Sequence, residues 1–199
     1  MIDHSEMKET KTSKRKLEIL ATAAKLFREN GYLATSVRDI AYSVGMEPSS
    51  LYSHISSKEQ LLVEICFNCA DQFMDGIKAI SSSDDSPETK IRNVIGLHLR
   101  IAEENPTSIT VFSDDWIHLP SDKRAEFVGK QKSYESAMRE IVAEGISKGI
   151  FANISAAVAV KTIISALRWT HYRRKPLTKE EKIRQMGEIT HLLLNGLCN

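Results

Sequence analysis

Apolar residues recur along most of this chain at spacings of three and four residues, which is the period of one face of an α-helix. Near the N-terminus, for example, Leu17, Leu20, Ala24 and Phe27 fall on one helical face. No segment shows the alternation of apolar and polar positions that is typical of a half-buried strand, and the sequence has no internal repeat. The pattern therefore predicts an all-α protein.

Capping and helix-breaking residues divide this pattern into separate elements. Asn30-Gly31 is expected to end the first helix, and Asn105-Pro106 to end a later one, because a residue before proline avoids the helical region. Further helices are expected at residues 36–44, 48–55, 58–80, 87–104, 107–118, 121–149, 155–172 and 178–197. Residues 1–12 are polar and mixed in charge, and we expect a mobile arm there.

The most informative pattern lies between Thr35 and Pro48. Either Thr35 or Ser36 can cap a short helix, and Ser36 with Asp39 has the spacing of a capping box. Gly45 follows the last apolar position of that helix, and glycine most easily takes the left-handed conformation that ends a helix. Pro48 suits the first turn of the next helix, where its missing N–H is not needed. Two short helices joined by this link predict a helix-turn-helix.

The second helix of this motif has two faces. Leu51 and Ile55 lie four residues apart and are expected to pack inward, so the hydroxyl-rich remainder faces outward. A helix in the DNA major groove presents its N-terminal residues to base edges and donors on its flanks to phosphates. The predicted base contacts are Arg38, Pro48, Ser49 and Ser50, the predicted phosphate contacts are Thr35, Tyr52, His54 and Lys58, and Ser36 belongs to the same DNA-facing set.

This segment resembles the DNA-binding signature of the TetR (TetR/AcrR) family of bacterial transcriptional regulators. The resemblance covers residues 14–62, and its matching positions are Thr35, Arg38, Asp39, Ile40, Ala41, Gly45, Leu51, Tyr52, Ser53, His54, Ile55, Lys58 and Leu61. Most members carry an aromatic residue where Ile55 stands, so one apolar residue replaces another. The resemblance implies a three-helix DNA-binding head, joined by a long helix to a helical-bundle domain for ligand binding and dimerisation.

Local charge agrees with a DNA-binding head although the whole chain is nearly neutral. The formal net charge is +1, which argues against a generally basic nucleic-acid coat protein. Lys8, Lys11, Lys14, Arg15 and Lys16 nevertheless cluster at the start of the chain. The arm that carries part of this cluster is either a frayed terminus or a basic arm that reaches the minor groove or the DNA backbone.

The helix expected at residues 58–80 is the rigid link to the rest of the chain, because no flexible linker follows the motif. Ser57 and Gln60 have the spacing of a capping box at its start. We therefore expect a DNA-binding domain at residues 1–57 and a ligand-binding and dimerisation domain at residues 58–199.

The sequence offers little support for other chemistry. Cys66 and Cys69 have C-x-x-C spacing, but on a helix they share its apolar face, and no second Cys/His pair with zinc spacing follows. We expect buried structural cysteines, no metal site and no cofactor. No serine lies in a nucleophile-elbow motif and no Gly-rich phosphate loop is present, so an enzyme is disfavoured.

The last two expected helices carry more apolar surface than one domain needs. One face of each can bury within its own domain and a second face needs a partner, although the pattern alone also fits two central helices of a monomer. The resemblance implies a homodimer in which these helices form a four-helix bundle with their mates. The expected dimer contacts are Ala157, Val160, Ile164, Leu167, Ile189 and Leu193.

Large or polar-tipped residues interrupt the apolar faces of the C-terminal helices. Each one alone is more easily explained as a core or surface residue, but together they fit a small-molecule cavity with an apolar wall and a few polar anchors. The resemblance implies such a cavity between residues 87 and 172. The candidate lining residues are His98, Trp116, Tyr134, Met138 and Trp169, and His118 and His171 share their character.

Two further features bear on the ligand. The segments around Trp116 and at residues 166–169 resemble TetR-family regulators of fatty-acid or steroid catabolism. The basic cluster Arg173-Arg174-Lys175 either attracts an anionic ligand, such as an acyl-thioester of coenzyme A, or complements a helix dipole. The expected effector is an acyl-CoA or another apolar ligand.

Taken together, the sequence predicts a homodimeric transcriptional regulator, a repressor that a small-molecule effector releases from double-stranded operator DNA. No apolar run approaches the ~20 residues that span a bilayer, and no signal-peptide core lies near the N-terminus, so we expect a cytoplasmic protein. The alternative is a helical ligand-binding or scaffold protein that has lost DNA binding and acts through protein contacts.

Overall fold

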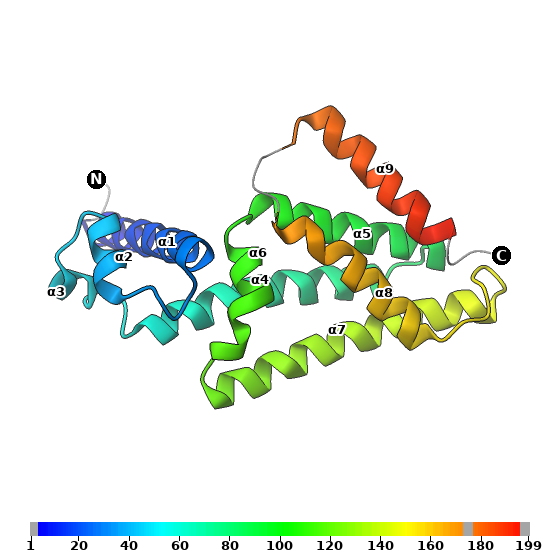
Figure 1. The fold of residues 1–199 in the computed structure, drawn as a ribbon, viewed down its shortest axis with the longest axis horizontal. Coiled ribbons are helices and arrows are strands. Elements are labelled where there is room, and N and C mark those ends of the chain that lie inside the picture. Colours follow the sequence, from blue (N-terminus) through cyan, green and yellow to red (C-terminus); the bar gives the residue numbers. More distant parts are fainter. Residues whose placement is uncertain (1–3, 173–176, 196–199) are drawn as a thin grey trace. The chain divides into compact units, whose positions relative to one another are not determined.

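The computed structural model describes residues 4–172 and 177–195, and the regular elements in this part of the chain are all helices (Figure 1). In chain order they are α1 (His4–Asn30), α2 (Val37–Ser43), α3 (Pro48–Leu51), α4 (Lys58–Ser81), α5 (Pro87–Glu104), α6 (Ser108–Asp114), the 3-10 helix η1 (Asp115–His118), α7 (Ser121–Ser147), α8 (Ala156–Arg168), the 3-10 helix η2 (Trp169–Tyr172) and α9 (Lys179–Asn195). The predicted all-α class is confirmed.

Two boundaries differ from the sequence expectation. The segment expected to be a mobile arm is largely helical, because α1 already begins at His4 and meets no proline or glycine before Asn30. α3 ends at Leu51, several residues earlier than expected, and residues 52–54 form a turn. In that turn the Ser53 hydroxyl donates to the Ser50 carbonyl at 2.7 Å, a local bond that competes with helix continuation.

The helices form two compact units. The first unit contains the chain up to Cys69 together with Thr107–Ala125, and the second contains Ala70–Pro106 together with the chain from Glu126. By compactness, the first half of α4 and the segment with α6 and η1 therefore belong with the helix-turn-helix. A functional division between residues 57 and 58 remains a prediction.

The first unit is built on α1, which packs against α2 and α6. Its core includes the fully buried side chains of Ile19, Phe27, Leu51 and Leu61. Gly31 ends α1 with φ of +84°, in the left-handed region that a residue with a Cβ rarely adopts. The two short helices after α1 are thus held by one small apolar core.

The second unit is built around α5, which packs against α8 and α9. Ile91, Ile95 and Ile163 are among its fully or almost fully buried residues. The Lys182 ammonium of α9 forms an ion pair with Glu103 of α5. No helix in the described part of the chain has the length and apolar character needed to cross a membrane.

Candidate nucleic-acid interface and buried polar cluster

α2 begins with the capping box that the sequence predicts. The Ser36 hydroxyl accepts from the Asp39 N–H at 3.2 Å and donates to the Asp39 carboxylate at 2.7 Å, while the Ser36 N–H donates to the same carboxylate at 2.8 Å. The hydrogen bonds from the Ser36 hydroxyl and N–H lower the pKa of Asp39. The hydroxyl of Ser36 therefore serves the helix itself, and Arg38 points outward from the same turn, exposed to solvent.

The link between α2 and α3 has the hydrogen bonds of a Schellman motif. The Met46 N–H donates to the Ala41 carbonyl at 2.9 Å, and Gly45 takes φ of +67°. Pro48 then opens α3, whose N-cap residue Glu47 makes no side-chain capping hydrogen bond. This short link sets the angle between the two helices of the motif.

α3 separates its faces as the sequence predicts. Leu51 is 0% exposed and Ile55 is 3% exposed, so both anchor the motif in the core. Ser49 and Ser50 are exposed, and Tyr52 follows them with 56% of its surface accessible. Three side chains that can donate to DNA therefore lie exposed on α3 and on the turn that follows it, and both are anchored from within.

The remaining predicted DNA contacts are less accessible. Pro48 and His54 are half-buried. Thr35 is 2% exposed, and its hydroxyl donates to the Gly31 carbonyl at 2.9 Å, so this side chain holds the end of α1 and is not presented to DNA. A threonine hydroxyl can bond a backbone carbonyl four residues earlier in the chain, and the sequence pattern alone did not distinguish this role from a DNA contact.

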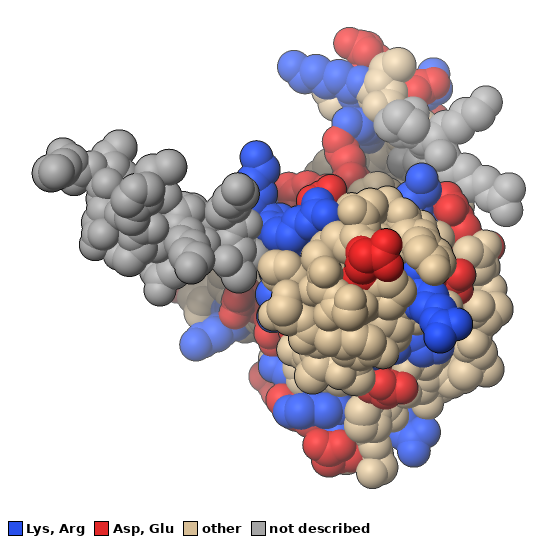
Figure 2. All heavy atoms as spheres, turned by 90° about the vertical axis from the view of Figure 1, so that its left-hand side faces the viewer, with Lys and Arg blue, Asp and Glu red and all other residues tan. Residues whose placement is uncertain are grey.

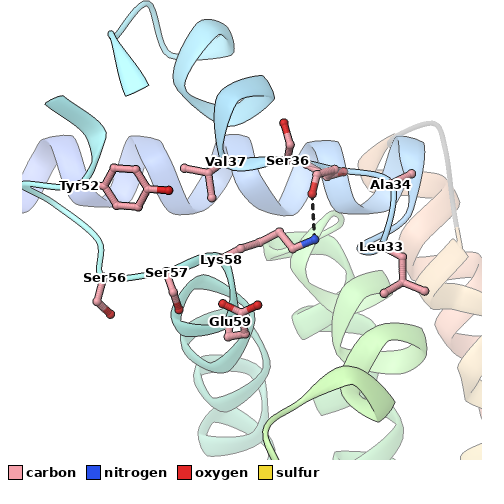
Figure 3. A pocket seen from close by; sticks show the side chains of 10 residues that line it. Leu33, Ala34, Ser36, Val37, Tyr52, Ser56, Ser57, Lys58 and Glu59 are labelled. Carbon is pink, nitrogen blue, oxygen red and sulfur yellow. Dashed lines mark hydrogen bonds between the residues drawn. The ribbon is translucent and has the colours of Figure 1, made fainter. Parts of the chain in front are cut away.

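Lys58 also makes hydrogen bonds within the head. Its ammonium donates to the carbonyls of Tyr32 and Thr35, both at 2.9 Å, and lies 4.2 Å from the centre of the Tyr32 ring. Two of its three donors are used, so one remains for a phosphate oxygen. The side chain crosses a pocket of about 390 Å³ whose wall also includes Ser36, Tyr52 and Ser57 (Figure 3).

Tyr32 is the centre of the contacts behind that pocket. Its ring stacks on His118 of η1 with centroids 5.4 Å apart and packs edge-on against Phe27 at 5.1 Å. Burial, followed by the negative charge of Glu59, raises the pKa of Tyr32 to about 12. Through these aromatic contacts, Tyr32 joins α1 and η1 next to Lys58.

Uncharged side chains dominate the end of the molecule that carries α2 and α3. Figure 2 shows mostly uncharged side chains on this face, with an acidic side chain among them and charged side chains of both signs around them. Lys16, part of the basic cluster expected to meet DNA, instead pairs with Glu64 of α4 at 2.9 Å. Sequence reasoning counted such residues as surface charge because their partners lie far away in the chain.

In the second unit, the structure brings together three of the five predicted ligand residues. His98 of α5 and Tyr134 of α7 are buried, with His98 Nε2 and the Tyr134 hydroxyl 2.9 Å apart. Met138 lies one turn after Tyr134 and is 0% exposed. The ring of Phe73 packs against both His98 and Tyr134, with centroids 4.7 and 5.7 Å away, and His171 stacks on His98 at 6.1 Å.

His98 and Tyr134 are uncharged in this cluster. Burial, with a smaller contribution from the positive charge of His171, lowers the pKa of His98 to about 3. Burial also raises the pKa of Tyr134 well above its ordinary value. The Nδ1 atom of His98 and the Oγ1 atom of Thr190 are buried without a hydrogen-bond partner among the described residues. Such orphaned atoms are uncommon and call for a partner.

The other two predicted ligand residues lie elsewhere. Trp116 belongs to η1 in the first unit, and Trp169 is 52% exposed at the start of η2. Both were chosen as large or polar-tipped residues on otherwise apolar helices. Phe73 joins the polar cluster without a distinguishing sequence signal. The Arg173-Arg174-Lys175 cluster lies outside the described residues.

The predicted dimer residues divide into two groups. Val160, Leu167 and Ile189 are buried inside their own chain, so they have no surface to offer a partner. Ala157 is exposed, and Ile164 and Leu193 are half-exposed. The large exposed apolar residues on these two helices are instead Val158, Ile183, Met186 and Leu192. The sequence period showed both faces of each helix but did not say which one faces inward.

Cys66 and Cys69 are buried free cysteines, as expected. Burial raises the pKa of both thiols, that of Cys69 to about 12, so neither is a reactive thiolate. The described residues contain no cluster of His, Cys, Asp or Glu that could hold a metal ion.

Known proteins share both parts of this chain. Residues 19–65 match the family model of the bacterial regulatory proteins of the tetR family, and residues 84–191 match that of the tetracyclin repressor-like C-terminal domain. The HTH-type transcriptional repressor KstR2 of Mycolicibacterium smegmatis is 30% identical over 138 residues, which cover 69% of this chain and 67% of that protein.

Solved structures share the fold. The ketosteroid transcriptional regulator KstR2 of Mycobacterium tuberculosis superimposes with a TM-score of 0.87 at 21% identity, over 93% of this chain and 95% of that one. AibR, in complex with isovaleryl coenzyme A and operator DNA, gives a TM-score of 0.79 at 22% identity, over 90% and 98%. The family matches and the fold agree with the exposed α3 and its buried anchors: the chain belongs to the TetR family of bacterial transcriptional regulators, which are DNA-binding proteins and not enzymes.

Proposed function

We propose that this protein is a repressor that binds its operator as a homodimer and leaves it when a small-molecule effector binds the second unit. The observation that carries the proposal is α3 with the turn after it, where Ser49, Ser50 and Tyr52 are exposed while Leu51 and Ile55 are buried in the core. A similar protein, KstR2 of Mycolicibacterium smegmatis, is named a repressor. Two copies of so short a helix need two half-sites to bind tightly, about 34–36 Å apart.

Within each head, Arg38 and residues 48–50 contact base edges and Tyr52 contacts phosphate. Lys58 adds its remaining donor to phosphate from the rim of the pocket in Figure 3. Thr35 and Ser36 support the site from behind, because their hydroxyls are engaged within the head. His54 is half-buried, and its Nδ1 atom is buried without a hydrogen-bond partner among the described residues.

The dimer forms through the outer faces of α8 and α9. Val158 is 61% exposed, Ile183 is 65% exposed and Leu192 is 73% exposed, an unusual apolar content for the surface of two helices. Together with Ala157, Ile164 and Leu193, these residues replace the buried Val160, Leu167 and Ile189 as the proposed contacts. Leu192→Lys should convert the dimer to a monomer in sedimentation velocity, whereas Leu17→Lys, at a similarly exposed position of α1, should not.

The effector is an acyl-CoA or another apolar molecule whose buried part carries an uncharged oxygen. Support comes from the neutral His98–Tyr134 pair and from the partnerless Nδ1 of His98, since a buried neutral group accepts a carbonyl or hydroxyl more readily than a carboxylate. AibR is seen with isovaleryl coenzyme A. The effector acts by shifting α4, which runs from the second unit into the first. A shift in population from 1:99 to 99:1 needs about 5.5 kcal/mol of differential affinity.

A single titration tests this proposal. Fluorescence anisotropy with the duplex that lies upstream of the protein's own gene should show binding that a random duplex of equal length does not match. Adding isovaleryl-CoA, longer acyl-CoA thioesters and steroid ketones in turn should release the protein with at least one of them. Equal affinity for both duplexes would contradict specific operator binding and favour a scaffold protein that acts through protein contacts.

A further inference from the structure

Arg15 makes a contact that its place in a basic cluster does not suggest. From α1, one terminal nitrogen donates to the Glu18 carboxylate at 2.6 Å, and the other donates to the backbone carbonyl of Val44 at 2.8 Å. Val44 lies 29 residues further along the chain, at the C-cap of α2. The side chain is 32% exposed, so this bond is partly shielded from water.

The accepting carbonyl stands at the point where the helix-turn-helix bends. Val44 precedes Gly45, whose left-handed conformation turns the chain toward Pro48 and α3. α3 has only four residues and no side-chain cap at Glu47. Its direction is therefore set by the link before it and by the buried Leu51 behind it. The hydrogen bond from the Arg15 guanidinium to that link therefore couples α1 directly to the orientation of α3.

Both terminal nitrogens of the Arg15 guanidinium already donate hydrogen bonds within the head. Charge-assisted hydrogen bonds of this kind are stronger than neutral ones, and an arginine held by two of them is largely fixed. Lys16, the next residue, is likewise engaged by Glu64, whereas Lys14 is exposed. Within the basic cluster, Arg15 and Lys16 are thus engaged within the head, whereas Lys14 is open to solvent.

We propose that Arg15 is a positioning residue for operator recognition: it fixes the angle of α3 through the Val44 carbonyl and makes no DNA phosphate contact. The proposal rests on operator binding as proposed above. The two roles have different physical signatures. A phosphate contact adds affinity for every duplex and contributes about 0.9 to the slope of log affinity against log salt. A positioning contact adds affinity for the correct sequence alone and leaves the slope unchanged.

The test compares two duplexes, one selected from a random-sequence library with the unaltered protein and one with the same composition scrambled. Arg15→Met keeps the apolar stem but removes both the charge and the donors. It should lose about tenfold in affinity for the selected duplex and less than twofold for the scrambled one. Its salt slope should equal that of the unaltered protein on both duplexes. Arg15→Lys, which keeps a donor for the carbonyl, should recover most of the lost discrimination.

Glu18→Gln serves as the matched control, because it removes only the ion pair and leaves the Val44 bond. It should discriminate between the duplexes as the unaltered protein does. A loss of discrimination equal to that of Arg15→Met would show that the ion pair, and not the carbonyl bond, positions the motif. If Arg15→Met lost the same affinity for both duplexes and had a shallower salt slope, Arg15 would be a phosphate contact. If its affinity were unchanged for both duplexes, Arg15 would have no role in DNA binding.

Two further measurements distinguish a folding defect from a loss of DNA recognition. If Arg15→Met is unfolded at the assay temperature in a thermal melt, the same slopes are measured on Arg15→Gln, which also lacks the charge, and a slope lowered on both duplexes again overturns the proposal. If the unaltered protein itself does not prefer the selected duplex, operator binding fails, which is a different outcome from a failure at Arg15.

Discussion

The two units treat their polar side chains in opposite ways. In the first unit, Ser49, Ser50 and Tyr52 stand on the outside of a helix whose apolar anchors are buried. In the second unit, His98 and Tyr134 bond to each other inside the core. The first unit therefore exposes hydrogen-bonding groups to solvent at this helix, whereas the second unit buries a bonded pair of such groups in its core.

The tyrosines show the difference most directly. Tyr52 is 56% exposed and Tyr134 is 8% exposed, although the sequence predicts a helix around each of them. An exposed phenol can donate to a phosphate at little desolvation cost, whereas a buried phenol must have a partner within the protein or the ligand. The same residue type is thus proposed to recognise a macromolecule in one unit and a small molecule in the other.

The largest expected effect contrasts neighbours on α3. Leu51→Ala should lower the free energy of unfolding by about 2–5 kcal/mol, because a fully buried side chain is removed. Ser50→Ala should change it by less than about 0.5 kcal/mol yet weaken operator binding. Urea denaturation and anisotropy measure the two quantities. Similar stability losses in both variants would mean that α3 does not separate anchoring from recognition.

Removing the exposed guanidinium of α2 should change specificity and leave folding intact. Arg38→Ala is expected to lose about 1–3 kcal/mol of discrimination between operator and random DNA, the value of a bidentate contact with guanine. Anisotropy on both duplexes checks this. If both affinities fell by the same factor, Arg38 would contact the DNA backbone.

Acid should destabilise the second unit through His98. Its folded pKa of about 3 lies below its ordinary value of 6.5, so the unfolded state binds the proton first. The stabilisation is full above pH 6.5 and is lost as the pH falls toward 3. About 2 kcal/mol should be lost between pH 7 and pH 5.

Urea denaturation at the two pH values measures that loss, and His98→Gln, which cannot titrate, supplies the control. The variant should show a smaller difference between pH 7 and pH 5 than the unaltered protein. An identical difference would assign the acid sensitivity to another group, with the neighbouring His171 as the first to examine.

The smallest expected effect concerns the cap of α2. Ser36→Ala removes the hydroxyl that bonds to the Asp39 N–H and carboxylate, and should cost about 1 kcal/mol of stability. Ser36→Asn retains a capping acceptor and should cost less. Thermal melts measure both, and equal stability of the alanine variant would show that the capping box contributes nothing in this head.

Much of the head could be predicted from its sequence because its signals are local. Ser36 and Asp39 are three residues apart, Gly45 and Pro48 bound one short link, and Leu51 and Ile55 are one helical turn apart. These relations are fixed by helix geometry and capping, whatever the rest of the chain does. The structure confirms the capping box, the left-handed glycine and the buried anchors.

The wrong or incomplete predictions share a different cause. Thr35 and Lys58 were assigned to DNA, yet their donors meet carbonyls of the same head. Trp116 and Trp169 were assigned to the ligand site, yet neither lies in the polar cluster of the second unit. In each case the side chain was classified by its chemistry, while its function depends on which distant residue folds next to it.

The sequence by itself determined the helices, their caps and the position of the reading helix, because these depend on residues within one or two turns of each other. The tertiary structure decided which cations are free, which tyrosine is buried and which face of α8 and α9 remains open. Those outcomes depend on contacts across the chain, such as Arg15 with Val44 and His98 with Tyr134, and a helical period contains no information about the partner at the other end.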